Sequence, residues 1–223
     1  MSMVLMVRHA QASFGAADYD RLSALGHKQS RWLGEYFASR GLKFARVVSG
    51  TLERQHDTAR GIVAAMGGNP SSIVRDDGLN EYHGEALYRA YAGHDARRAQ
   101  GGDYGAYWRV FREAMRAWSE DRVAGVPESW AAFGARVRGA LAAAAADTAR
   151  DDVVLVVSSG GAIARAVADI NESPASIAIE LNLQFRNTGV CELIWGGGRF
   201  RLLSYNSAPH LDHPERRDAI TFA

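Results

Sequence analysis

The fold of this chain is decided by the stretch Met3-Val-Leu-Met-Val-Arg8-His9-Ala-Gln11-Ala-Ser13. Its apolar part, residues 3–7, predicts a buried strand, and the strand ends at once in Arg8 and His9. Open α/β sheets bind ligands at the carboxyl ends of their strands. An arginine placed there offers a planar charged fork for phosphate or carboxylate, and an imidazole can act as nucleophile, base or metal ligand. The alternative is a surface arginine and a loop histidine that happen to adjoin.

Length and composition indicate one domain of 223 residues that can bury a sizeable core, since 47% of its residues are hydrophobic. The net charge of +1 argues against nucleic-acid and membrane partners. Cys191 is the only cysteine, which excludes an intrachain disulfide and favours a reducing compartment. No signal peptide or membrane-spanning run is recognisable, and nearly all basic residues are arginine. We therefore expect a soluble cytoplasmic protein of bacterial origin.

Strand and helix patterns alternate along the chain. The sequence predicts a helix over residues 24–39, with Ser23 as its N-cap and Gly41 as its stop. Further strands are expected at 44–48, 73–74, 153–157, 188–195 and 200–205. Further helices are expected at 162–169 and in the segment that has Arg54 in its first turn and ends at about residue 66. Three glycines, 196–198, predict a hairpin between the last two strands. The pattern is typical of an α/β three-layer sandwich: a mostly parallel central sheet, helices on both faces and one antiparallel strand.

Residues 78–126 interrupt this pattern and are interpreted as a partly helical cap insertion within a single domain spanning residues 1–223. Helices are expected at 104–122 and 129–150, the second capped by Ser129. The segment is rich in aromatic and basic residues that suit a phosphorylated organic substrate, namely Tyr82, Tyr88, Tyr91, Tyr104, Tyr107, Trp108, Arg89, Arg97 and Arg98. The alternative, at least as strong for half of the aromatics, is that they pack the cap onto the sheet. His94 is expected at the surface.

Four sequence blocks resemble motifs of the histidine phosphatase superfamily, also called phosphoglycerate mutase-like. Arg8-His9-Ala10-Gln11 is similar to its opening Arg-His-Gly signature. Residues 49–59, Ser-Gly-Thr-Leu-Glu-Arg-Gln-His-Asp-Thr-Ala, resemble the family's Ser-x-Pro-Leu-x-Arg-x-x-Gln-Thr-Ala, which makes Arg54 the second phosphate-binding arginine. The alternative is an exposed Arg54 paired with Asp57. In the third block the family's proton-donating glutamate falls on Glu81, and His83 is an alternative donor.

The fourth block, Val157-Ser158-Ser159-Gly160-Gly161, resembles the family's Val-Ser-His-Gly-Gly, so that Ser159 stands where the family carries its second catalytic histidine. Glycines that open a helix after a core strand let backbone N–H groups face an anion. Ala10 replaces the family's glycine. Gly15 stands where many mutases carry a phosphate-contacting asparagine, which argues against a phosphoglycerate mutase.

The resemblance implies a phosphatase that hydrolyses a phosphate monoester through a phosphohistidine on His9. The expected catalytic residues are His9, Glu81, Arg8 and Arg54. The expected phosphate-binding residues are Arg8, His9, Arg54, Gln11, Ser159 and Gly160. No cofactor or metal is expected, because the arginines supply the positive charge. The partner is a small phosphorylated substrate, and a homodimer remains open.

Two other functions are kept as alternatives. Loss of the histidine at position 159 is compatible with a catalytically impaired protein that binds a phosphorylated ligand. A serine hydrolase using Ser158 or Ser159, with Asp212 and His213 downstream, is less well supported, because Val156 stands where the first glycine of a nucleophile elbow belongs. If the phosphatase assignment is right, Ser159 should limit the rate and Ser159→His should raise it.

Overall fold

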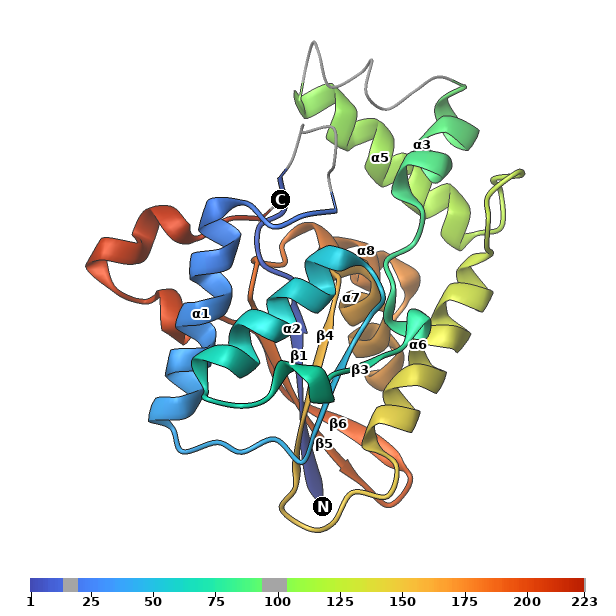
Figure 1. Cartoon of the computed structure of the whole chain (residues 1–223). Coiled ribbons are helices and arrows are strands. Elements are labelled where there is room, and N and C mark those ends of the chain that lie inside the picture. Colours follow the sequence, from blue (N-terminus) through green and yellow to red (C-terminus); the bar gives the residue numbers. More distant parts are fainter. Residues whose placement is uncertain (14–19, 94–103, 223) are drawn as a thin grey trace.

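The computed structural model describes residues 1–13, 20–93 and 104–222, with six strands in one sheet (Figure 1). The strands follow the spatial order β3-β2-β4-β1-β5-β6. Their bounds are Ser2–Arg8 for β1, Arg46–Ser49 for β2, Val74–Arg75 for β3, Val153–Ser158 for β4, Val190–Gly196 for β5 and Arg199–Ser207 for β6.

The first strand lies in the middle of the sheet. It pairs in parallel with β4 and antiparallel with β5. Strands β2 and β3 continue the parallel side, and β6 pairs antiparallel with β5. Strand β5 therefore runs against the other five, which confirms the predicted mostly parallel sheet with one antiparallel strand. Gly197 and Gly198 have φ values of +61° and +74° and form the hairpin turn.

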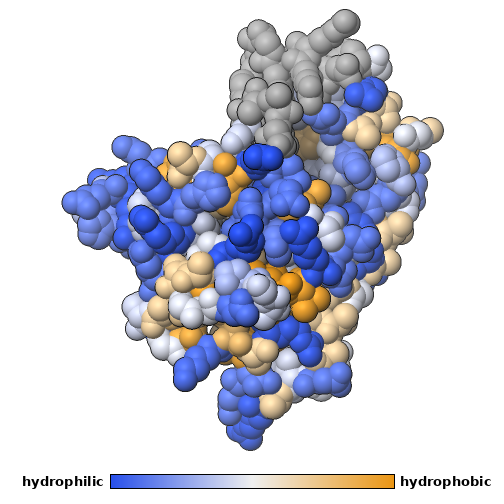
Figure 2. Space-filling view, viewed as in Figure 1, coloured by the Kyte–Doolittle hydropathy of each residue, from blue (hydrophilic) through white to orange (hydrophobic). Residues whose placement is uncertain are grey.

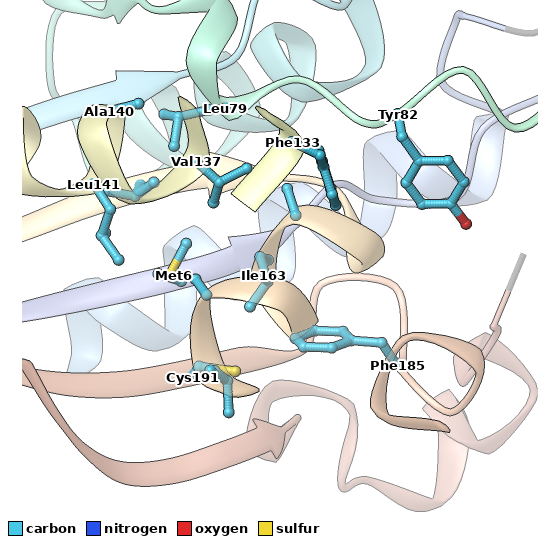
Figure 3. Packing of buried hydrophobic residues seen from close by; sticks show 14 of the residues in the cluster. Met6, Leu79, Tyr82, Phe133, Val137, Ala140, Leu141, Ile163, Phe185 and Cys191 are labelled. Carbon is cyan, nitrogen blue, oxygen red and sulfur yellow. The ribbon is translucent and has the colours of Figure 1, made fainter. Parts of the chain in front are cut away.

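Helices cover both faces of the sheet, as predicted (Figure 1). The side chains of β1 alternate between the faces: Leu5 and Val7 belong to the core cluster beneath α1 and α2, whereas Val4 and Met6 belong to the cluster beneath α6 and α7. Figure 3 shows Met6 and Ile163 packed within the second cluster. The helices are Ala24–Ser39 for α1, Glu53–Ala65 for α2, Gly84–Ala92 for α3, Tyr104–Ser119 for α5, Trp130–Ala145 for α6, Gly160–Ile170 for α7 and Ala175–Leu183 for α8.

Capping chemistry explains which predicted boundaries hold. Helix α1 has the predicted bounds, and the Ser23 hydroxyl accepts from the Gly26 N–H. Ser129 caps α6 in the same way, through the Ala132 N–H. Strand β3 spans residues 74–75, not 73–74, because this short exposed edge carries no burial pattern. Helices α5 and α6 end earlier than predicted, α7 begins two residues earlier, and α3 and α8 were not predicted.

The segment 78–126 contributes α3 and α5, which lie beyond the carboxyl ends of the strands (Figure 1). Tyr82, Tyr88, Phe111 and Met115 share one hydrophobic cluster with β1 and β4, so the described part of this segment has no separate core. Tyr82 and Tyr88 are buried, and these two aromatics pack the segment onto the sheet. Tyr91 and Trp108 are exposed. His94, Arg97, Arg98 and the side chain of Tyr104 lie outside the described residues.

None of the helices in the described ranges combines the length and the apolar character that crossing a membrane requires. On the face shown in Figure 2, hydrophilic residues cover most of the described surface.

Candidate active site

Four segments far apart in the sequence meet at the carboxyl edge of the parallel strands. Strand β1 ends in Arg8 and leads to His9, the turn after β2 leads to Arg54 at the start of α2, and β4 leads to Ser159 before α7. The His9 N–H donates to the Ser158 carbonyl at 2.8 Å, which joins the first and third of these turns. The loop that carries Glu81 completes the group, because the Glu81 carboxylate reaches the start of α7. The sequence-predicted residues Arg8, His9, Arg54 and Glu81 therefore do come together.

The His9 imidazole is held in one tautomer. Its Nδ1 lies 2.8 Å from the carbonyl oxygen of Ala10, which can only accept, so Nδ1 carries the proton and donates. Its Nε2 is left with a lone pair and accepts from Nε of Arg54 at 3.3 Å. Because His9 is 4% exposed, the ring has little freedom to turn. The structure thus presents an unprotonated Nε2 toward a guanidinium group.

The electrostatics keep this histidine neutral. Burial lowers the pKa of His9 well below 6.5, because the charged form loses its hydration, and the positive charges of Arg54 and then Arg8 lower that pKa further. The hydrogen bond to Ala10 acts in the opposite direction and is the smallest of these effects. His9 is therefore an imidazole with an available lone pair at neutral pH.

Arg54 is buried, at 8% exposure, and does not pair with Asp57. Its Nη1 donates to Oδ1 of Asp20 at 2.6 Å, and Asp57 instead lies 3.5 Å from Arg60. The exposed Arg54–Asp57 alternative is therefore wrong. Asp20 was not singled out from the sequence, and no local pattern marks it, because the contact joins residues 34 positions apart.

Arg8 donates through Nη1 to the carbonyl oxygens of Phe185 and Phe222, the latter at 2.8 Å. A Cβ added to Gly160 would lie 3.4 Å from Nε of Arg8, so the glycine lets the arginine pass close to the start of α7. Arg8 and Arg54 both lie close enough to lower the pKa values of His9 and Glu81. The two arginines thus act electrostatically on one site.

Glu81 lies in a loop, as predicted, and its Oε2 accepts from the Gly161 N–H at 2.9 Å. The acceptor that faces this helix start is therefore a carboxyl oxygen of the protein itself. A Cβ at position 161 would lie 2.3 Å from Oε1 of Glu81, which explains the glycine there. Burial raises the pKa of Glu81 above 4.5, and the Gly161 hydrogen bond, Arg54 and Arg8 offset part of the shift. The protonated form consequently persists to higher pH than for an exposed glutamate.

Ser159 is fully buried, and its hydroxyl accepts from Nε2 of Gln55 at 2.8 Å. Gln55 was missed in the sequence, although its spacing to Ala59 and Ile62 on the buried face of α2 was an available signal. The Oε1 of Gln11 accepts a hydrogen bond from the Ser23 hydroxyl at 2.7 Å. The phosphate-binding role of Gln11 stays a prediction. His83 is exposed at the start of α3. Gly15 lies outside the described residues.

No group of three or more His, Cys, Asp or Glu side chains that could hold a metal gathers within residues 1–13, 20–93 and 104–222. The expectation that the site needs no metal stays a prediction.

A buried strand-end histidine that lies in the field of two arginines, with a buried glutamate at the same sheet edge, is a set of groups that can carry out phosphoryl transfer. Residues 4–208 match the model of the histidine phosphatase superfamily (branch 1), and the chain belongs to this family. Over 85 residues it is 32% identical to a 2,3-bisphosphoglycerate-dependent phosphoglycerate mutase of Mesorhizobium japonicum. That match spans 35% of this chain and 41% of the mutase.

Solved structures agree on the fold. A mycobacterial glucosyl-3-phosphoglycerate phosphatase in complex with inorganic phosphate superposes with a TM-score of 0.68 at 24% identity, covering 94% of this chain and 99% of the other. A phosphoserine phosphatase of Entamoeba histolytica in complex with 3-phosphoglyceric acid also gives 0.68, at 20% identity, covering 95% of this chain and 100% of the other.

Proposed function

We propose that this protein is a phosphatase that hydrolyses a phosphate monoester through a phosphohistidine on His9. The observation that carries the proposal is the fixed tautomer of His9. Its Nδ1–H is tied to Ala10, and its Nε2 lone pair faces the Arg54 guanidinium. An anionic phosphoryl group bound to Arg8 and Arg54 would meet that lone pair. Both solved structures named above are phosphatases, which supports hydrolysis of the ester over transfer of the phosphoryl group by a mutase.

In the first step the Nε2 lone pair of His9 attacks phosphorus, and the bond from phosphorus to the ester oxygen breaks. The leaving alkoxide takes the proton of Glu81, whose raised pKa keeps that proton available. Arg8 and Arg54 hold the charge on the phosphoryl oxygens during transfer. The products of this step are an alcohol and a phosphohistidine.

In the second step water attacks phosphorus and gives a proton to the Glu81 carboxylate. The phosphorus–nitrogen bond breaks and returns its electron pair to Nε2. Inorganic phosphate leaves, and both Glu81 and His9 regain their starting protonation states. Each group thus works once in each direction, as microscopic reversibility requires for an acid that later acts as a base.

The alternatives receive different support. A nucleophile elbow places its serine on a strained turn, whereas Ser159 has an extended backbone with φ −114° and ψ 163°. His213 accepts from the Glu215 N–H within its own exposed turn. These observations argue against a serine hydrolase. The motif resemblance that aligns Ser159 with the family's second histidine is what supports the alternative of an impaired phosphate-binding protein.

Brief incubation with a labelled aryl phosphate, followed by a denaturing quench, tests the proposal. We expect a phosphoenzyme that is labile in acid and stable in base, and vanadate should block turnover. His9→Ala should abolish labelling, whereas His27→Ala, an exposed histidine on α1, should label like the wild type. Full activity of His9→Ala, or an acid-stable adduct, would overturn it.

The segment 78–126 is proposed to select the ester group of the substrate. Arg89 on α3 is exposed near the exposed Tyr91, and both lie outside the packed aromatic cluster. Arg89→Ala should therefore change KM to different degrees across a panel of phosphate esters. A uniform response across the panel would count against a selective cap.

A further inference from the structure

Ser159 and Gln55 form a buried pair next to the proposed phosphoryl site, which consists of Arg8, His9 and Arg54. Both side chains are fully buried, and the Nε2 of Gln55 lies 2.8 Å from the Ser159 hydroxyl. Gln55 follows Arg54 directly on α2, and Gly160, which follows Ser159, packs against Arg8. The pair therefore joins the start of α2, which carries Arg54, to the turn after β4, which lies against Arg8.

The orientation of the Gln55 amide follows from its neighbours. Its Nε2 also lies 3.2 Å from the Leu79 carbonyl oxygen, which can only accept, so this end of the amide is the nitrogen and both its N–H groups are used. Its Oε1 is buried and finds no hydrogen-bond partner among the described residues. A Cβ at position 50 would lie 1.8 Å from this oxygen, so Gly50 provides its space. A buried acceptor without a partner is unfavourable, which points to a role for the nitrogen end.

The Gln55 contact decides what the Ser159 hydroxyl can do. A hydroxyl has one hydrogen to donate and two lone pairs. The Gln55 N–H fills a lone pair, so the hydrogen must find its acceptor elsewhere. Ser159 is the N-cap of α7, yet its side chain makes no capping bond. Within the described residues its hydrogen makes no hydrogen bond, whereas a phosphoryl oxygen bound to the arginines would accept one.

We propose that Gln55 is a positioning residue that fixes the Ser159 hydroxyl as a hydrogen-bond donor to the transferring phosphoryl group. This inference rests on the proposed phosphatase function. The serine with its glutamine then fills the place of the family's second histidine. It also revises the expectation for Ser159→His: an imidazole would extend past the serine oxygen into the space of the Gln55 amide, which lies 2.8 Å away.

The experiment compares Ser159→Ala, Gln55→Met and the double variant in kcat and KM for an aryl phosphate. Methionine keeps the length of glutamine and removes the amide. We expect a kcat loss of about 10²-fold for Ser159→Ala and about fivefold to tenfold for Gln55→Met, with KM within about threefold in both. Because Gln55 acts through Ser159, the double variant should be about as slow as Ser159→Ala alone. Additive losses, or unchanged kcat in Gln55→Met, would overturn the inference.

A second set tests the space argument. Ser159→His alone should lower kcat, whereas Gln55→Ala combined with Ser159→His should restore or exceed the wild-type rate, because the smaller residue at 55 frees room for the ring. An increase in kcat for Ser159→His alone would contradict the proposed pair. Ser2→Ala serves as the control, since it removes a side-chain hydrogen bond to Thr148 at the opposite end of β1. Thermal unfolding identifies variants that fail to fold.

Vanadate affinity separates the two levels of the argument, because vanadate mimics the five-coordinate transition state and needs no turnover. If the wild type does not hydrolyse phosphate esters but Ser159→Ala and Gln55→Met both weaken vanadate binding, the phosphatase proposal fails, and what stands is that Gln55 positions Ser159 toward a bound oxyanion. If the wild type turns over and Gln55→Met leaves both kcat and vanadate binding unchanged, the positioning role fails alone. If the wild type does not turn over and neither variant weakens vanadate binding, both the phosphatase proposal and the positioning role are wrong.

Discussion

The Asp20 carboxylate bridges the guanidinium of Arg54 and the first turn of the helix that carries it. Its Oδ1 accepts from Arg54 at 2.6 Å, and its Oδ2 accepts from the Glu53 N–H at 2.9 Å. Residue 52, the N-cap of α2, supplies no side-chain bond, so Asp20 caps the helix from another segment. The same carboxylate therefore orients Arg54 and places a negative charge beside the proposed phosphate site.

Asp20→Asn should strengthen the binding of inorganic phosphate. Asparagine keeps an acceptor oxygen for Arg54 but removes the charge that repels the anion, and one unit charge at about 4 Å is worth about 1 kcal/mol in water, or about fivefold in Ki. Competitive inhibition by phosphate at low salt measures the effect, which high salt should reduce. Asp57→Asn, on the same helix beside Arg60, is the matched control. Weaker inhibition in Asp20→Asn would mean that ordering Arg54 outweighs repulsion.

The loss of kcat/KM as pH rises should reflect the deprotonation of Glu81. As the general acid, Glu81 must be protonated, and its raised pKa extends that form above the ordinary range, so its contribution falls as pH rises through the raised value. His9 must be neutral, and its lowered pKa keeps it so until far below pH 6.5. We therefore expect kcat/KM for an alkyl phosphate to be greatest on the acidic side of neutrality.

A comparison of the wild type with Glu81→Gln isolates the contribution of Glu81 to the pH dependence, because the ionisation of the substrate phosphate affects both proteins equally. The ratio of wild-type to variant kcat/KM should be large at low pH, about 10²-fold or more, and shrink as pH rises. With an aryl phosphate, whose leaving group needs little protonation, the ratio should stay small. Glu85→Gln on α3 is the control, as an exposed glutamate four residues away. A ratio independent of pH would exclude Glu81 as the acid.

Arg136 on α6 holds the loop that presents Glu81. Its Nη1 donates to the carbonyl oxygens of Asn80 at 2.7 Å and Gly78 at 3.1 Å, while Glu128 binds the other edge of the guanidinium. Lysine cannot span these acceptors. Arg136→Lys should lower kcat for an alkyl phosphate by about threefold to tenfold with KM nearly unchanged, and affect an aryl phosphate much less. The control is Arg138→Lys, because Arg138 is also on α6 but pairs with Asp169 on α7, and this variant should leave kcat unchanged for both substrates.

Local chemistry made much of this fold predictable. The run of residues 3–7, the Ser23 cap and the glycines at 197 and 198 each specify their own structure, and each prediction holds. The same is true of Arg8 and His9, whose position follows from where a buried strand stops. Helix α8 was not predicted, because its apolar residues show almost no helical segregation along Ala175–Leu183.

The contacts that complete the candidate site were not predictable in this way. Asp20 meets Arg54 across 34 positions, and Gln55 meets Ser159 across 104. Neither partner is marked by a neighbour in sequence, and both depend on how the sheet brings β1, α2 and α7 to one edge. The helical spacing of the buried residues of α2 did indicate that Gln55 is buried, but such spacing does not identify the residue that Gln55 contacts.

The last prediction concerns stability in acid. His210 is buried, and its Nε2 lies 2.8 Å from the Thr188 hydroxyl. That hydroxyl donates to the Asn187 carbonyl, so Nε2 must carry the proton. Nδ1 is buried and has no hydrogen-bond partner in the part of the chain that the structure describes. Burial, and then the charge of Arg216, lower the pKa of His210 to about 3. Thr188 has a φ of +55°, and its N–H donates to the Arg8 carbonyl, which connects this turn to the site.

Between the unfolded value of 6.5 and about 3, the unfolded chain binds a proton at this residue that the folded protein does not. Stability is therefore complete above 6.5 and falls as pH decreases, by about 2 kcal/mol at about pH 5 from His210 alone. The buried His9 acts in the same direction.

Urea unfolding of the wild type and His210→Gln, each at about pH 7.5 and about pH 5, measures this contribution. His210→Gln should be the less stable protein at the higher pH, because it disturbs a buried side chain, but it should lose about 2 kcal/mol less on acidification. His27→Gln, an exposed site on α1, should keep the wild-type loss. Equal losses in wild type and His210→Gln would show that His210 becomes protonated without unfolding the turn at Thr188.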